Sequence, residues 1–308
     1  MEVTLTKDDI FLPEYRGRLT EGISFNKNIN AVLWVDIRLA QLHRYKLDSS
    51  KHEVLELPEG ESMGTMGFTS DNDVYLIGTK NGISRANFNT KEITFLKEYP
   101  TDNAKLRSNE GKVDPWGNMI IGTMCDFPYE HNMEPIGTLY RINSSLDMEI
   151  LETDCFVPNG LGFNAEKTKF FWVDSETNTI FQYDYDPQTH EFSNKQPFFK
   201  LVQFCEGAPD GMFLSTKEEF WVATFGGSCV LRINMKGELV QKFNIPAKQV
   251  TCMTIGGGYL WINTCLIGST DLKNKAELTT EGDLGGYLFK YKLDEDVGEE
   301  AQYLFNFQ

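Results

Sequence analysis

Short apolar stretches rich in aromatic and β-branched residues recur along the whole chain. Six of them share one form, an apolar quartet whose second residue is Trp or Tyr in all but one copy: Leu33–Asp36, Val74–Ile77, Met119–Gly122, Phe171–Asp174, Phe220–Ala223 and Leu260–Asn263. Successive copies lie about 40 to 50 residues apart, which is the spacing of a four-stranded propeller blade. The pattern therefore predicts a repeat built from short strands.

A second series of apolar stretches follows the first, and each member carries a basic or aromatic residue: Leu42–Tyr45, Ile83–Ala86, Thr138–Ile142, Ile180–Tyr183, Val230–Ile233 and Tyr287–Tyr291. No long stretch keeps apolar residues at helical spacing, and the gaps are too short for the crossover helices of a parallel α/β fold. We therefore predict an all-β protein, a six-bladed β-propeller with four-stranded antiparallel blades, in one domain over residues 1–308. Residues before Glu21 are expected to add an edge strand to the last blade.

An oxygen-bearing side chain stands close to a glycine at the start of the first strand in four copies. These side chains are Glu21, Asn109, Asn159 and Asp210. The loop between the second and third strands of a blade lies on the face where the first strand starts, and the two longest inserts, 126–135 and 267–284, fall in such loops. Inserts on one face of a repeat protein usually mark its binding face. Both inserts are expected to roof the four side chains.

These four side chains offer only hard oxygen donors. Such a set suits Ca²⁺ best, and Mg²⁺ or Mn²⁺ less closely, with positions left for water and a substrate oxygen. The alternative is structural, because Asn-Gly and Asp-Gly are favoured turn dipeptides. Four such residues at equivalent repeat positions favour a metal site over four unrelated turns. The matching places in copies two and six, Met63–Thr65 and Thr251–Met253, predict a weakly polar side where a substrate could lie.

Arg107 precedes Asn109 by two residues and is expected to point the same way along its strand, toward the channel mouth. There it could hold an anionic or hydroxyl-rich ligand. The alternative is a surface cation in a long loop. Asp36 and Asp174 each end a Trp-Val-Asp strand and are interpreted as caps on turns.

Composition excludes several classes of function. The 308 residues are 41% hydrophobic and 24% charged, and the formal net charge of −16 argues against a nucleic-acid partner. The start has no signal-peptide pattern and no window is apolar enough to span a membrane, so the prediction is a cytoplasmic protein with reduced, mostly buried cysteines. The four histidines form no HxxxH or HxH pair, which disfavours a zinc hydrolase of the thermolysin type.

One stretch carries a family resemblance. Residues 107–118 followed by Gly122-Thr123-Met124 resemble the R-x-N-D-G-K-x-D-P-x-G…G-T-M signature of the regucalcin (senescence marker protein), gluconolactonase and luciferin-regenerating enzyme family. Supporting matches run in family order from about residue 19 to 265: Leu19–Gly22, Leu33–Asp36, Pro158–Leu161, Tyr183–Asp186, Pro209–Gly211 and Val250–Met253 with Gly256-Gly257.

The resemblance implies a six-bladed propeller with one divalent metal ion in its channel. It assigns the metal-ligand role to Glu21, Asn159 and Asp210, with Asn109 as a further ligand or a substrate contact. It also implies that Asp210 is the general base and that Arg107 contacts substrate hydroxyls. The chain departs from the family pattern at Ile23 and Phe25, at Glu110 in place of the usual Asp, and in the insert 126–129, where some members carry an acidic substrate contact.

These inferences predict a metal-dependent lactonase that opens a sugar lactone or related ester. The cofactor would be one divalent ion, Ca²⁺ first, with Zn²⁺, Mn²⁺ or Mg²⁺ as alternatives, and the partner a small-molecule lactone. Two alternatives stay open. One is a phosphotriesterase or fluorophosphatase that uses the same site, and the other is a non-enzymatic calcium-binding propeller, because fold alone does not settle function.

Overall fold

The computed structural model describes residues 2–268 and 282–307, and its regular structure is almost entirely β. Four antiparallel sheets have four strands each. The first is β2 (Thr20–Asn26), β3 (Ala31–Asp36), β4 (Gln41–Lys46) and β5 (Lys51–Glu56); the second is β6 (Met63–Phe68), β7 (Val74–Thr79), β8 (Gly82–Asn87) and β9 (Glu92–Glu98). The third is β10 (Leu106–Val113), β11 (Met119–Cys125), β12 (Gly137–Ile142) and β13 (Met148–Cys155); the fourth is β14 (Pro158–Phe163), β15 (Lys169–Asp174), β16 (Thr179–Tyr185) and β17 (Phe192–Lys200).

The remaining eight strands form one larger sheet. They are β18 (Ala208–Leu214), β19 (Glu219–Phe225), β20 (Cys229–Asn234), β21 (Leu239–Asn244), β22 (Gln249–Gly256), β23 (Tyr259–Cys265), β24 (Phe289–Lys292) and β1 (Glu2–Thr4). A single residue pair, Phe225 with Gln249, joins β19 to β22. Four short 3₁₀ helices lie in connections: η1 (Lys7–Asp9), η2 (Phe127–Asn132), η3 (Ser175–Thr177) and η4 (Leu201–Gln203). None of the described helices is long and apolar enough to cross a membrane.

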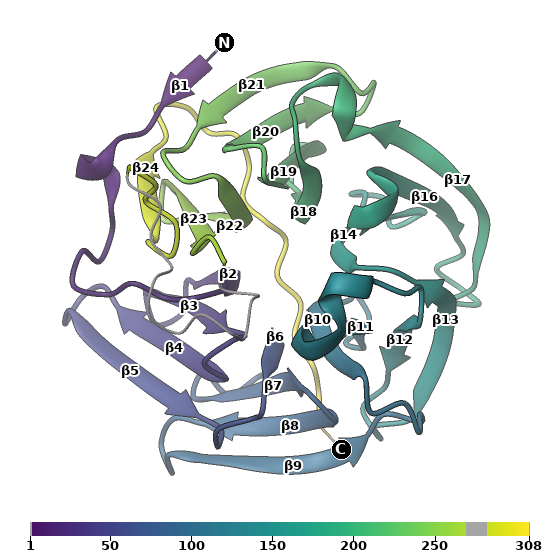
Figure 1. Cartoon of the computed structure of the whole chain (residues 1–308). Coiled ribbons are helices and arrows are strands. Elements are labelled where there is room, and N and C mark those ends of the chain that lie inside the picture. The colour runs from purple at the N-terminus through teal and green to yellow at the C-terminus, as the bar shows by residue number, and fades with distance from the viewer. Residues whose placement is uncertain (1, 269–281, 308) are drawn as a thin grey trace.

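The sheets are arranged like propeller blades around a common centre (Figure 1). Their inner strands β2, β6, β10, β14, β18 and β22 contact one another in that order, and β22 contacts β2. The predicted apolar quartets form the second strands, which are buried on both faces, whereas the outer strand β5 alternates between exposed and buried residues. The predicted all-β fold of four-stranded antiparallel sheets is therefore confirmed.

The hydrophobic core lies between adjacent sheets. Phe171 and Val173 of β15 pack with Phe220 and Val222 of β19, for example. The quartet tryptophans Trp34, Trp172, Trp221 and Trp261 are at most 1% exposed. Removing such a ring from a core typically costs about 3 to 5 kcal/mol. The recurrence of Trp at this position thus has a packing role, and it leaves the channel to other residues.

The N-terminal prediction is confirmed in part, because Ile10 bridges to the last strand, but β1 itself lies elsewhere. The strand β1 pairs in parallel with β21, which precedes β22, β23 and β24 in the chain. It lies there because Val3 and Leu5 pack into the cluster around Phe243. The chain then passes β24 with one bridge, Ile10 to Phe289, and the Phe11 N–H donates to Leu288 O at 2.8 Å. These contacts join the beginning of the described chain to its last strand.

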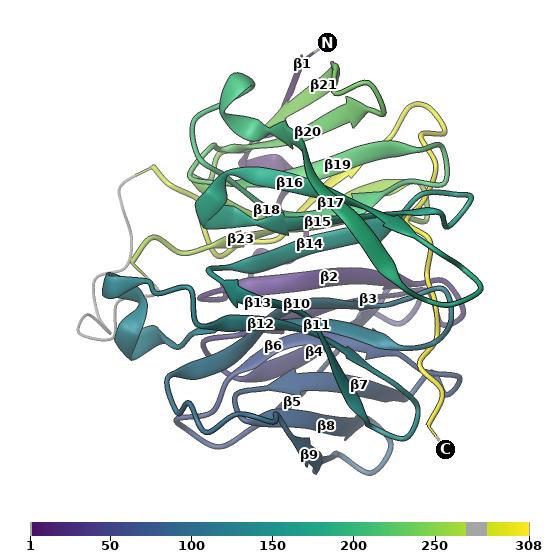
Figure 2. The same cartoon turned by 90° about the vertical axis from the view of Figure 1, so that its right-hand side faces the viewer.

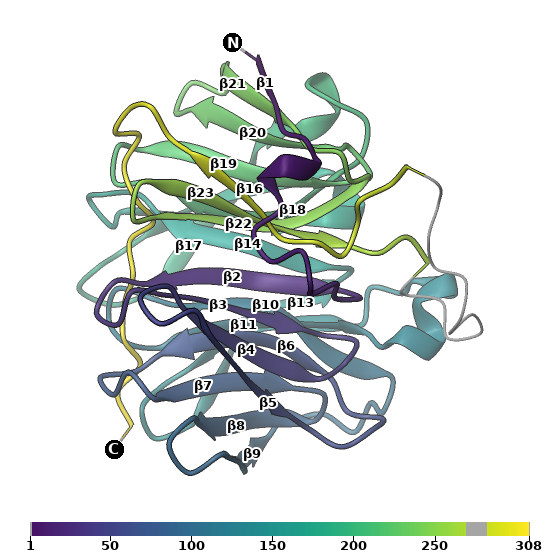
Figure 3. The same cartoon turned by 90° about the vertical axis from the view of Figure 1, so that its left-hand side faces the viewer.

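The C-terminal segment crosses the face opposite to η2 (Figures 2 and 3). Residues Glu299 to Phe305 bond to three sheets. The Thr216 N–H donates to Glu299 O at 2.9 Å, the Phe305 N–H donates to Phe68 O at 2.7 Å, and the Gln302 amide donates to Phe25 O. This segment closes one end of the central channel.

Acid should destabilise the protein through His43, which lies in β4 and is 2% exposed. Its ring stacks on Trp34 at 4.9 Å, and Nδ1 lies 3.0 Å from His52 Nε2. Burial, together with the neighbouring His52, lowers the pKa of His43 to about 3. The unfolded chain binds this proton near pH 6.5, so stability falls as pH drops from about 6.5 to 3, by about 1.4 kcal/mol per pH unit. Between pH 7 and pH 4, the free energy of unfolding measured with denaturant should fall by about 3 kcal/mol less in His43→Phe than in wild type. Equal falls in the two proteins would contradict this assignment.

Candidate functional site

Every inner strand has a β-bulge at the same level of the channel. Register shifts lie between Glu21 and Ser24 in β2, Met63 and Thr65 in β6, Ser108 and Gly111 in β10, Pro158 and Leu161 in β14, Pro209 and Met212 in β18, and Val250 and Cys252 in β22. A bulge interrupts the alternation of a strand and re-aims its side chains, and bulges are common beside active sites. This device turns side chains of consecutive positions, Asn109 and Glu110, toward the channel.

The glycines at the bulges let neighbouring inner strands approach closely. A Cβ on Gly160 would lie 2.0 Å from the Met212 backbone nitrogen, and one on Gly211 would lie 2.8 Å from Cys252 Cα. A Cβ on Gly64 would lie 2.5 Å from Asn109 O. The Asn-Gly and Asp-Gly pairs therefore lie inside strands β14 and β18, and the turn interpretation of these dipeptides was wrong. Their glycines serve close packing of strands around the channel.

All five predicted site residues line one pocket of about 260 Å³ on the η2 side of the channel. Glu21, Arg107, Asn109, Asn159 and Asp210 are each 2 to 6% exposed. The alternative for Arg107, a surface cation in a loop, is excluded because the residue is buried within β10. The other pocket residues are Leu19, Met124, Met133, Val157, Ser175, Glu176, Ala208 and Phe225.

Hydrogen bonds join the pocket side chains in a row. Arg107 Nη1 donates to Asn109 Oδ1 at 2.9 Å, and Asn109 Nδ2 donates to Asn159 Oδ1 at 3.2 Å. Asn159 Nδ2 then donates to Ser175 Oγ at 2.8 Å, whose hydroxyl donates to Pro209 O at 2.6 Å. The row orients both amides, so that each amide oxygen keeps one lone pair for a further partner.

The two buried carboxylates of the pocket, Glu21 and Asp210, share it with one cation, Arg107. Burial raises the pKa of Glu21 well above its usual range, and the charges of Asp210 and Glu110 raise it further. Burial and Glu110 likewise raise the pKa of Asp210, while Arg107 and the amide of Asn159 act in the opposite direction. Buried carboxylates that repel one another are stabilised in the ionised form by a bound cation. The electrostatics of the pocket therefore fit a metal ion.

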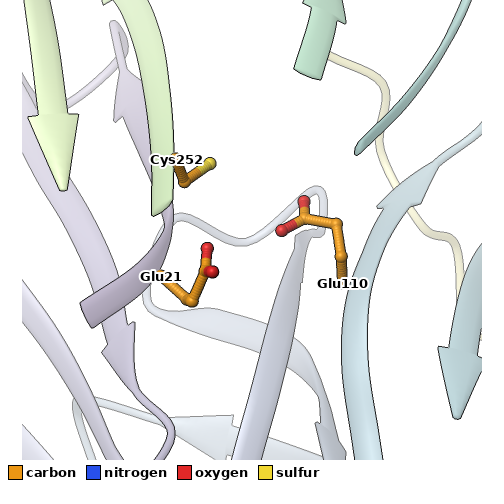
Figure 4. A group of neighbouring side chains, drawn as sticks. All are labelled: Glu21, Glu110 and Cys252. Atoms are coloured by element: carbon orange, nitrogen blue, oxygen red, sulfur yellow. The ribbon is translucent and has the colours of Figure 1, made fainter. Parts of the chain in front are cut away.

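Two further inward-facing residues were missed as donors. The carboxylate oxygens of Glu21 and Glu110 and the Cys252 sulfur approach to within 4.8 Å of one another, and Figure 4 shows the three side chains turned toward one point. The sequence marks Glu110 as a departure from the family signature and the Cys252 position as weakly polar, and neither is predicted as a donor. Their signal in the sequence was position, since Glu110 adjoins Asn109 and Cys252 occupies the equivalent place in the sixth repeat.

The first insert covers the pocket, as expected. The guanidinium carbon of Arg107 lies 4.4 Å from the centre of the Phe127 ring, and Met133 lines the pocket. Asp126 caps η2 by accepting from the Phe127 N–H at 2.9 Å and pairs with Lys80 at 2.6 Å, which are structural roles. Most of the second insert, 267–284, lies outside the described residues.

Asp36, Asp174 and the cysteines have the structural roles that the sequence predicts. Asp36 accepts from the backbone N–H groups of Arg18, Leu19, Arg38 and Leu39, and Asp174 accepts from Phe156 and Val157. Both therefore hold turns. All six cysteines lie in the described residues as free thiols, and only Cys205 is not buried.

The fold and the site together define the class, a propeller-like protein with a buried acidic pocket in its central channel. Residues 19–265 match the SMP-30/Gluconolactonase/LRE-like region, and the chain belongs to this family. The resemblance seen in the sequence is thus confirmed.

Individual relatives agree with the family. The chain is 36% identical to the cell growth-regulated gene 1 protein of Candida albicans over 98% of each chain. It is 29% identical to the L-arabinolactonase of Azospirillum brasilense, over 84% of this chain and 85% of that protein. The solved structure of a calcium-binding protein, regucalcin, from Agrobacterium tumefaciens superposes with a TM-score of 0.82 at 21% identity, covering 100% of this chain and 98% of that one. This last similarity bears on the fold.

Proposed function

We propose that this protein is a divalent-metal-dependent lactonase of the sugar-lactone type, built as a single six-bladed propeller in which β18–β21 and β22–β24 form the last two blades. The observation that carries the proposal is the convergence of Glu21, Asn159 and Asp210 with Arg107 in one buried pocket. Relatives named as lactonases, including the L-arabinolactonase of Azospirillum brasilense and the pentonolactonase of Haloferax volcanii, support the reaction class.

The donor set decides the cofactor in this proposal. Glu21, Asn159 and Asp210 would hold the ion, with Asn109 beside it, and their all-oxygen donors favour Ca²⁺. The excess negative charge of the pocket supports this assignment, because burial and neighbouring carboxylates raise the pKa of Glu21 and of Asp210. A divalent ion bound there would supply a Lewis acid that polarises the lactone carbonyl.

The protein's own groups have distinct roles in the proposal. The Asp210 carboxylate accepts the proton of the attacking water, as a general base within the pocket. The Arg107 guanidinium and the Asn109 amide are linked to each other at 2.9 Å, and together they orient the oxygens of the lactone ring. Phe127 and Met133 from the first insert, together with Met124, limit the access of water to the ester.

The first test is hydrolysis of glucono-δ-lactone, measured by proton release above the spontaneous rate. Chelation should abolish turnover, because it removes the Lewis acid that would polarise the lactone carbonyl. Adding back Ca²⁺, Zn²⁺, Mn²⁺ or Mg²⁺ singly should restore turnover, with Ca²⁺ as the most effective ion. The matched control is Glu21→Gln, which should not recover with Ca²⁺ at concentrations that restore wild type.

Two results would contradict parts of this proposal. Turnover that survives complete chelation excludes the metal-dependent mechanism. Metal-dependent thermal stabilisation without turnover of any lactone, carboxylic ester or phosphotriester would support the metal site and rule out the enzymatic activity. A ligand at 100 times its Kd stabilises the folded state by about 2.7 kcal/mol, so thermal unfolding detects such binding.

A further inference from the structure

The central channel contains two chambers. The larger, on the η2 side, holds the pocket described above. The smaller has a volume of about 70 Å³ and is closed by the C-terminal segment, of which Glu300 and Gln302 line the chamber. Its other polar walls include Glu110, Lys112 and Cys252. Glu21 lines the larger chamber and lies within 4.8 Å of Glu110 and Cys252, so these three residues stand at the junction.

The three side chains come from three inner strands, β2, β10 and β22, and all are less than 5% exposed. The bulges of these strands direct them to a common point (Figure 4). Glu110 Oε2 is buried and has no hydrogen-bond partner in the described part of the protein. The contact of the Cys252 sulfur with Met253 O is long, at 3.9 Å. A buried carboxylate oxygen without a donor costs free energy unless something binds it.

Buried negative charge exceeds positive charge along the channel. Glu21, Glu110, Asp210 and Glu300 face two cations, Arg107 and Lys112. Lys112 Nζ is already bound to Glu300 Oε1 at 2.5 Å and to Met212 O at 2.9 Å. A single divalent cation in the larger chamber therefore balances the carboxylates but leaves no charge to stabilise a thiolate at Cys252. A second cation at the junction would therefore bind together with loss of the Cys252 thiol proton.

We propose that the junction is a second cation site, in which Cys252, Glu110 and Glu21 bind a thiophilic divalent ion such as Zn²⁺. A tetrahedral zinc ion with these donors needs ligand atoms about 3.3 to 3.6 Å apart, given Zn–S near 2.3 Å and Zn–O near 2.0 to 2.2 Å. The ligand atoms lie within 4.8 Å of one another, and rotation of the two Glu side chains would bring them to this spacing. The smaller chamber supplies water as the fourth ligand, since its volume exceeds the roughly 30 Å³ that one water molecule occupies.

The two carboxylate oxygens of Glu21 allow it to contribute to both sites. Its Oε2 accepts the Gly22 N–H at 3.2 Å, which holds the carboxylate in place between the chambers. The sites differ in donor type, because only the junction offers a thiol. Thiolate ligands select ions such as Zn²⁺ over Ca²⁺, and binding releases the thiol proton. The inference concerns metal binding and stands independently of lactone hydrolysis.

Cobalt(II) is the probe, because a thiolate bound to it produces a charge-transfer absorption that oxygen ligands do not. Titration of metal-free, full-length protein with cobalt chloride should produce this near-ultraviolet band with one equivalent per chain. Cys252→Ser should abolish the band and still bind Ca²⁺. Glu110→Gln should weaken cobalt binding at the band-forming site at least roughly tenfold, since even an outer partner of a metal ligand contributes that much.

Two variants make the result specific. Cys205→Ser is the matched control, because Cys205 is the one thiol that is not buried, and the band should persist in it. Asp210→Asn should also retain the band, which separates the junction from the larger chamber. Folding of each variant is checked by circular dichroism, and Glu110→Gln keeps the test decisive if Cys252→Ser does not fold. A wild-type protein without the band, or a band that survives in Cys252→Ser, overturns the proposal.

Discussion

Replacing Asp210 by Asn is expected to reduce kcat/KM for lactone hydrolysis by roughly 10²- to 10⁴-fold, the usual contribution of a general base. The change keeps the shape of the side chain but removes both the proton acceptor and one negative charge of the pocket. Asp210 is 5% exposed and raises the pKa of Glu21, so the variant also relieves repulsion between buried carboxylates. Its thermal stability without metal should equal or exceed that of wild type. Steady-state kinetics and thermal unfolding measure the two effects separately.

The matched control for this experiment is Asp114→Asn. Asp114 is also buried and lies directly after β10, but its carboxylate accepts from the Trp116 and Asn118 N–H groups at 2.9 and 2.8 Å. This substitution should lower stability and leave the turnover of the folded protein near that of wild type. Full lactonase activity in Asp210→Asn would rule out the proposed mechanism.

Replacing Gly160 by Ala should destabilise the protein by about 3 kcal/mol or more, at the upper end of overpacking substitutions. The new methyl group would lie 2.0 Å from the Met212 nitrogen and 2.6 Å from Met212 Cα, so β14 and β18 would have to separate. A chain of this size should then unfold about 5 °C or more below wild type. Because Asn159 precedes this glycine, the affinity of the pocket for Ca²⁺ should fall as well.

Gly162→Ala, in the same strand, is the control. The nearest atom to its added Cβ is Leu214 N at 3.3 Å, so a small shift accommodates it. The free energy of unfolding should change by less than about 1 kcal/mol. Equal effects of the two substitutions would show that strand separation around the channel is not the cause.

Much of the architecture could be predicted from the sequence because each repeat buries its second strand on both faces. Such strands read as apolar quartets, and Trp34, Trp172, Trp221 and Trp261 mark four of them. The inward position of Glu21, Asn159 and Asp210 follows from their equivalent places in the repeat. Whether a metal ion occupies the pocket stays a prediction.

Other features could not be predicted, because they depend on contacts that leave no periodic pattern in the sequence. Strict alternation along a strand would place Asn109 and Glu110 on opposite faces, and only the bulge in β10 brings both into the channel. The position of β1 beside β21 depends on apolar residues 240 positions away, as the pairing of Val3 with Phe243 shows. The path of residues 299–305 depends on contacts with distant strands, such as the ion pair of Glu300 with Lys112 and the burial of Phe305.

The C-terminal segment also bears on how the protein is made. Residues 299–305 leave the ribosome after every strand that they touch, from Phe25 in β2 to Thr254 in β22. Until Glu300 arrives, Lys112 has no carboxylate at 2.5 Å and one end of the channel stays open to water. A nascent chain therefore completes its ring of strands before it seals the channel. Polypeptides truncated before Glu300 would contain every described strand but would lack the segment that crosses this end of the channel.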